Sequence, residues 1–70
     1  MTVTVSELKS IGDYGVGFTL DASKYSTLDL ISIAEEIKGT MTLKNAGIKS
    51  ALDLKSIAEI NPGKIVFDFT

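Results

Sequence analysis

Two stretches of this chain decide its fold: STLDLISIAEEIKGTMTLK (residues 26–44) and SALDLKSIAEINPGKIVFD (residues 50–68). Placed one above the other, with a shift of 24 residues and no gap, they are identical at nine of nineteen positions. A third, partial copy is present near the start of the chain, where ELKSI (residues 7–11) matches DLKSI (residues 53–57). Self-similarity at a fixed period of this length indicates supersecondary units that stack side by side.

Each copy is predicted to begin with a helix. A hydroxyl residue followed three positions later by a carboxylate is typical of a helix N-terminus, because the hydroxyl accepts a first-turn N–H and the carboxylate reaches back. This pair occurs three times, at Thr4/Glu7, Ser26/Asp29 and Ser50/Asp53. The middle copy then places Leu30, Ile33, Ala34 and Ile37 at helical spacing, which predicts one buried stripe. The equivalent stripes are Leu54, Ile57 and Ala58 in the third copy, and Leu8 and Ile11 in the first.

Each helix is predicted to lead into a strand, over residues 18–22, 41–45 and 65–69. Alternation of side chains turns one set toward the core: Phe18, Leu20, Met41, Leu43, Ile65, Phe67 and Phe69. The other face then carries Thr19, Asp21, Thr42, Lys44, Val66 and Asp68. In register, this face has a row Asp–Lys–Asp, whose alternating charge favours pairing of neighbouring strands. Val3 and Val5 either form a fourth short strand or cover the first repeat.

The sequence therefore predicts an α/β fold of three tandem helix–strand repeats of about 23–24 residues. The strands form a small parallel sheet, and the helices pack on one face of it. We expect a single domain over residues 1–70, with repeat units of approximately 4–25, 26–49 and 50–70.

The repeat resembles the leucine-rich-repeat family. MTLKNAGI (residues 41–48) and FTLDASKY (residues 18–25) both look like its LxLxxNxL strand segment, with Ala46 and Ser23 where that family has Asn or Cys. The resemblance covers roughly residues 4–70 and implies a short solenoid. Residues 19–36 also resemble the sulfate-transporter and anti-sigma-antagonist domain, which implies a regulatory role with Ser26 or Thr27 near the phosphorylated position.

Composition argues against several classes of function. The chain has no cysteine and no histidine, so the usual general base, thiol nucleophile and zinc ligands are missing. We expect neither an enzyme nor a bound cofactor or metal. All seven positive charges are lysines and the net charge is −2, which disfavours nucleic acid as a partner. No apolar run approaches the roughly 18 residues that span a bilayer, and no signal peptide is evident, so a cytoplasmic location is expected.

Two candidate sites remain. The strand-to-helix loops carry Lys24, Ser26, Lys49 and Ser50 at helix N-termini, an arrangement that predicts a weak anion site. Ile31 stands where the other copies have Lys9 and Lys55, so it is either additional core or an exposed contact point.

These patterns favour two functions. In the first, the chain is a non-enzymatic protein-interaction module, with itself as the expected partner through an open sheet edge. Its interaction surface would use Thr19, Asp21, Ile31, Thr42, Lys44, Val66 and Asp68. In the second, it is a small regulatory or ligand-binding α/β domain, acting at the strand-to-helix loops.

Overall fold

Helices and strands alternate along the computed structural model, which describes residues 4–69. The elements are helix α1 (Val5–Asp13), strand β1 (Phe18–Asp21), helix α2 (Thr27–Glu36), strand β2 (Met41–Lys44), helix α3 (Ala51–Ile60) and strand β3 (Ile65–Phe67). Short 3-10 turns, η1 (Ala22–Lys24) and η2 (Ala46–Ile48), follow β1 and β2. The predicted α/β class and the order of helices and strands are confirmed.

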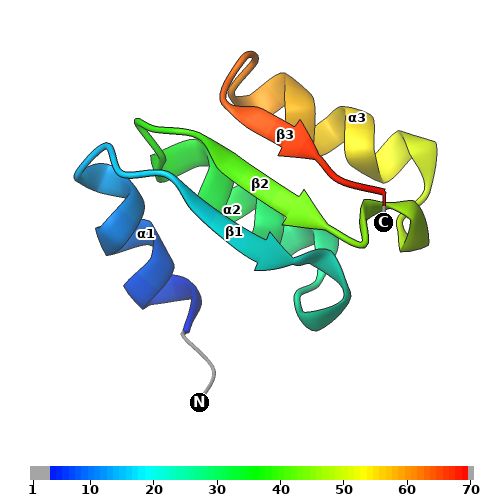
Figure 1. The fold of residues 1–70 in the computed structure, drawn as a ribbon, viewed down its shortest axis with the longest axis horizontal. Helices are drawn as coiled ribbons and strands as arrows, with labels where there is room; N and C mark the ends of the chain where they lie inside the picture. Colours follow the sequence, from blue (N-terminus) through cyan, green and yellow to red (C-terminus); the bar gives the residue numbers. More distant parts are fainter. Residues whose placement is uncertain (1–3, 70) are drawn as a thin grey trace.

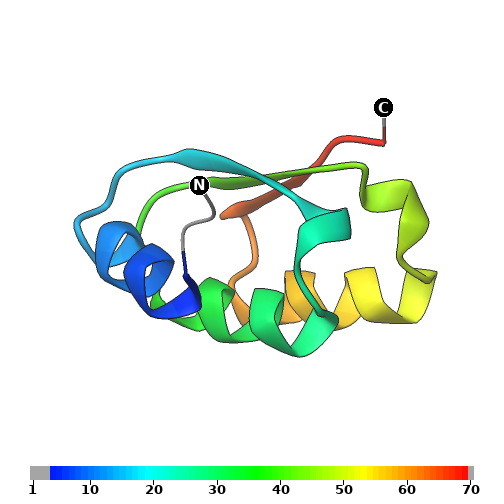
Figure 2. The ribbon, with the colours of Figure 1, turned by 90° about the horizontal axis from the view of Figure 1, so that it is seen from below.

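The strands form one parallel sheet in the order β1-β2-β3 (Figure 1). Met41 pairs with Phe18 on one side and with Ile65 on the other, so residues in register lie 23 and 24 positions apart. All three helices lie in a layer against one face of the sheet, and the opposite face is not covered by any helix of the described residues (Figure 2). Consecutive helices contact one another, as consecutive strands do.

The helices begin where the hydroxyl residues predict. The Thr4 hydroxyl accepts from the N–H of Glu7, and a Glu7 carboxylate oxygen accepts from the N–H of Thr4 at 3.0 Å, which completes a capping box. Ser26 and Ser50 accept from the N–H groups of Asp29 and Asp53, both at 3.1 Å. The return bond is not formed at these two aspartates, because their side chains are one methylene shorter than that of Glu7.

The core lies between the sheet and the helices. Its fully buried large side chains are Leu30, Ile33, Met41, Leu43 and Ile57. The whole predicted stripe of α2 is buried, and the middle repeat is packed on both sides by its neighbours. Half-buried apolar side chains of the outer repeats, including Phe18, Ile65 and Phe67, complete this core.

The predicted strands were too long at their C-terminal ends. Ala22 begins η1, and Asn45 adopts a left-handed conformation with φ 57°, so β1 and β2 end one residue earlier than expected. Phe69 follows β3 and is 65% exposed, so its predicted core position is wrong. Ile11, predicted to lie in a buried stripe, is 40% exposed, because the first repeat is an outer one and has a neighbouring repeat on one side.

The structure decides for Val5 between a fourth strand and a cover over the first repeat. Val5 is the first residue of α1 and packs, half-buried, against the core, so it covers the first repeat and does not form a strand. Val3 lies outside the described residues.

Candidate interaction surfaces

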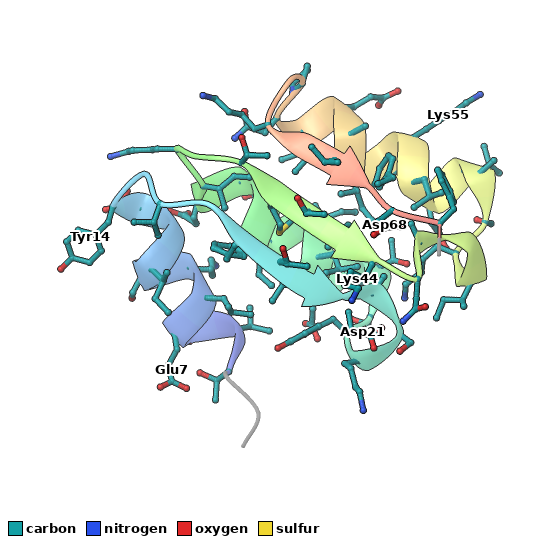
Figure 3. All side chains as sticks on the ribbon, in the orientation of Figure 1. Glu7, Tyr14, Asp21, Lys44, Lys55 and Asp68 are labelled. Atoms are coloured by element: carbon teal, nitrogen blue, oxygen red, sulfur yellow. The ribbon has the colours of Figure 1, made fainter. Side chains whose placement is uncertain are left out.

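The face of the sheet turned away from the helices carries the polar side chains that alternation predicted. Thr19, Thr42 and Val66 are in register across β1, β2 and β3, and Asp21 is in register with Lys44. Asp68 continues this second row, since its N–H donates to the carbonyl of Leu43 at 2.8 Å. Figure 3 shows Asp21, Lys44 and Asp68 side by side across the C-terminal ends of the strands. These residues therefore share one surface, which we call the open face.

Ile31 does not belong to the open face. It lies on α2, in the helical layer, where it is half-buried and packs against the core. Of the two alternatives left by the sequence, the structure favours additional core in the middle repeat. The seven residues predicted as one interaction surface are thus divided between the two layers of the fold.

On the open face, Asp21 of β1 is hydrogen-bonded to neighbouring turns and is not ion-paired with Lys44. The same Oδ1 oxygen of Asp21 accepts from the hydroxyl of Ser23 at 2.6 Å, from the N–H of Ser23 at 2.9 Å and from the Asn45 amide at 3.0 Å. Asp21 and Lys44 are adjacent in register, yet they form no ion pair in the described part of the chain. The carboxylate is instead held by the turns that follow β1 and β2.

These bonds stabilise the charged form of Asp21. The hydrogen bond from the Ser23 side chain, followed by that from Asn45, lowers the pKa of Asp21 to about 2 from its ordinary value of 3.8. Asp21 is therefore negative throughout the neutral pH range. The open face carries a fixed negative charge next to Lys44.

Acid titration tests this description. Because the unfolded chain binds the proton of Asp21 more readily than the folded one, the stability that Asp21 contributes is present above pH 3.8 and is lost as the pH falls through about 2. An NMR titration of the Asp21 carboxyl carbon is expected to show a midpoint near pH 2. Asn45→Gly keeps the left-handed backbone and removes one donor, so it should move this midpoint upward. A midpoint near 3.8 in the parent chain contradicts the hydrogen-bonding scheme.

The residues of the predicted anion site are close to the expected loops, and most of them take part in local structure. Ser26 and Ser50 are the N-caps of α2 and α3. Lys49 Nζ donates to the backbone carbonyl of Tyr25 at 2.8 Å, while Lys24 is exposed on η1. The anion site remains a prediction, and its hydroxyls and Lys49 already have a structural role.

Sequence reasoning missed the side chains that connect neighbouring repeats. Asn45 to Asp21, Lys49 to Tyr25 and Asn61 to Ile37 are hydrogen-bonded pairs, and each joins residues 24 positions apart. Asn61 Nδ2 also donates to the carbonyl of Ala34 at 3.2 Å, so one amide serves two carbonyls at the end of α2. The repeat alignment carried a signal for these bonds, because its shift is also 24 residues. A polar side chain is therefore a candidate to bond the residue aligned with it in the preceding repeat.

The outer edge of β3 is the other surface of interest, because β3 has β2 on one side and no strand of the described residues on the other. The Lys64 carbonyl accepts from the N–H of Met41 at 2.8 Å, and the Asp68 N–H donates to Leu43, so these positions face β2. Successive strand residues direct their backbone groups to opposite edges, so Val66 also faces β2 while Ile65 and Phe67 face outward. Val66 is 47% exposed, and the rings of Phe67 and Phe69 lie near one another, tilted by 54° with their centroids 6.3 Å apart. We call Lys64 to Phe69 the β3 edge.

No family model, curated protein or solved structure matches this chain. Within residues 4–69, no cluster of acidic side chains has the arrangement of a metal site. In the same part of the chain, every helix is too short or too polar to cross a membrane.

Proposed function

We propose that this chain is a non-enzymatic protein-interaction module that associates with a second copy of itself through the β3 edge. The observation that carries the proposal is the combination of outward backbone groups at Ile65 and Phe67 with apolar side chains around them. An edge of this kind is a template for a further strand, because each unpaired N–H and C=O gains a hydrogen-bond partner there. The cytoplasmic location expected from the sequence stays a prediction.

The apolar residues of the edge support the same conclusion. Val66 lies on the open face and Phe69 follows β3, and both are large side chains with about half or more of their surface exposed. Ile65 and Phe67 are half-buried, whereas their equivalents Met41 and Leu43 are fully buried between neighbouring strands. A strand added at this edge would complete the burial that the middle repeat already has, at about 25 cal/mol for each Å² of apolar surface removed from water.

The solution mass of the chain tests the proposal directly. Sedimentation equilibrium over a wide concentration range is expected to give a species of twice the chain mass of 7.5 kDa. Val66→Lys places a charge on the exposed side of the edge strand and should shift the equilibrium to the monomer. A parent chain that remains monomeric at millimolar concentration contradicts self-association.

Thr19→Lys is the matched control, since Thr19 is exposed in the same row of the open face on the outer strand β1. It is expected to leave the mass unchanged. If Thr19→Lys dissociates the assembly and Val66→Lys does not, the contact lies at β1 and the proposed edge is wrong. Circular dichroism of both variants confirms that the fold persists.

A further inference from the structure

The backbone of the β3 edge restricts how a second copy can bind. In an antiparallel pair, residues that exchange backbone hydrogen bonds lie directly opposite each other and alternate with residues that do not. Since Ile65 and Phe67 are the residues facing outward, they must occupy the hydrogen-bonded positions. Three symmetric registers satisfy this requirement: Ile65 opposite itself, Phe67 opposite itself, or Ile65 opposite Phe67.

The charges that flank β3 distinguish these registers. Lys64 immediately precedes the strand and Asp68 immediately follows it. When Ile65 lies opposite Phe67 of the second copy, Lys64 lies opposite Asp68, and this attractive pair occurs twice by symmetry. When Phe67 lies opposite itself, Asp68 faces Val66; when Ile65 lies opposite itself, Lys64 faces Val66. Of the three registers, only the one with Ile65 opposite Phe67 places opposite charges across the interface.

We propose that two copies pair their β3 strands antiparallel around a two-fold axis beside Val66, held by reciprocal Lys64–Asp68 pairs; this inference rests on the self-association proposed above. Val66 then lies opposite Val66 of the second copy, at a position without interstrand hydrogen bonds. The two sheets join into one sheet of six strands, with both helical layers on the same side. A two-fold contact of this kind closes on itself and ends at a dimer.

The charge row of the open face argues against the head-to-tail alternative. Stacking copies in the same direction would pair β3 with β1 of the next copy, in the parallel register that relates neighbouring repeats. Within one copy, that register places Asp21 of β1 beside Lys44 of β2, and Lys44 beside Asp68, which follows β3. If the same register continued into the next copy, Asp21 of that copy would lie beside Asp68. Two carboxylates in adjacent strands repel, whereas the two-fold arrangement avoids this contact.

The helical layer also has room for a second copy next to α3. The equivalent positions of α1, α2 and α3 carry small residues, Gly12, Ala34 and Ala58. A Cβ on Gly12 would lie 2.8 Å from Ile37 Cγ2, and the Ala34 carbonyl receives the Asn61 amide. The third member of this set, Ala58 of α3, is half-buried, while Ala34 is fully buried. The two-fold pairing brings α3 of the second copy toward Ala58, whose small side chain permits a close approach of the helices.

A single cysteine tests the position of the axis. The chain has no cysteine of its own, so Val66→Cys introduces one thiol per copy. Directly opposite Cβ atoms in an antiparallel pair are about 4.5–5.5 Å apart, and closest where no hydrogen bonds are exchanged, which is near disulfide geometry. Mild oxidation is expected to cross-link Val66→Cys nearly completely, while Thr19→Cys alone stays uncrosslinked. Cross-linking of a mixture of Thr19→Cys and Val66→Cys chains to each other, in place of Val66→Cys homodimers, would establish the head-to-tail arrangement and overturn the inference.

Charge reversal provides an independent test of the register. Lys64→Glu and Asp68→Lys each convert both symmetric pairs to repulsion, so each variant should self-associate roughly tenfold more weakly than the parent chain. Mixing the two variants restores attraction in both pairs, so a heterodimer should form with about parental affinity. A mixture that remains as weak as the separate variants, while the parent chain dimerises, overturns the register and leaves self-association standing. A monomeric parent overturns self-association itself.

Discussion

Leu30→Ala is expected to destabilise the protein by about 3 kcal/mol, because it removes a fully buried side chain from the middle of the core. Leu30 lies on α2, which contacts both neighbouring helices, so the surrounding side chains cannot readily collapse into the space left behind. A chain of 70 residues has a total stability of roughly 4–10 kcal/mol, so the loss is a large fraction of it. Urea denaturation followed by circular dichroism measures the change.

Leu28→Ala is the matched control. Leu28 lies on the same helix and is 76% exposed, so the same substitution should change stability by less than about 0.5 kcal/mol. Both variants carry the same small gain in helix propensity. Equal losses at the two positions would contradict the packing of α2 against the sheet.

Gly39→Ala is expected to cost about 2 kcal/mol, the second largest effect. A Cβ at this position would collide with the backbone carbonyl oxygen of Gly15 and lie 2.7 Å from that of Val16. Both are main-chain atoms of the loop between α1 and β1, which cannot move aside as a flexible side chain could. The loop after α2 and the loop after α1 are therefore in close contact at Gly39. Thermal unfolding of the variant measures the loss.

Gly47→Ala separates this effect from a general intolerance of glycine replacement. A Cβ on Gly47 would have its nearest neighbour, Phe69 Cδ1, at 3.8 Å, which is an ordinary contact. The substitution should be within about 0.5 kcal/mol of neutral. If Gly39→Ala is as well tolerated as Gly47→Ala, the close approach of the two loops is wrong.

Much of the fold could be predicted because the repeat carries strong local signals. The hydroxyl residues Thr4, Ser26 and Ser50 are the N-caps, as expected. Helical spacing identified the buried stripe of α2, and alternation identified which strand residues face the core in β2. Equivalent units stacked in sequence order place equivalent strands side by side, so the parallel sheet followed from the repeat itself.

The candidate surfaces were less predictable from the sequence. Alternation indicated that Thr19, Thr42 and Val66 share one face, and they do. It could not show that Asp21 bonds to Ser23 and Asn45 and not to Lys44, since this depends on turns whose backbone shape is not periodic. Nor could it show that Ile31 packs on the core, because its equivalents are lysines.

The sequence by itself determined the three helix–strand units, their caps, their alternation and their parallel order. These features depend on hydrogen bonds and side-chain periodicities within a few residues of each position. Tertiary structure alone decided three features: the left-handed turn at Asn45, the hydrogen bonds from the Asn61 amide to two carbonyls at the C-terminal end of α2, and the exposure of Ile11 and Phe69. The physical reason is that each of these depends on which atoms of a neighbouring repeat lie within contact distance, and the two outer repeats have such a neighbour on one side.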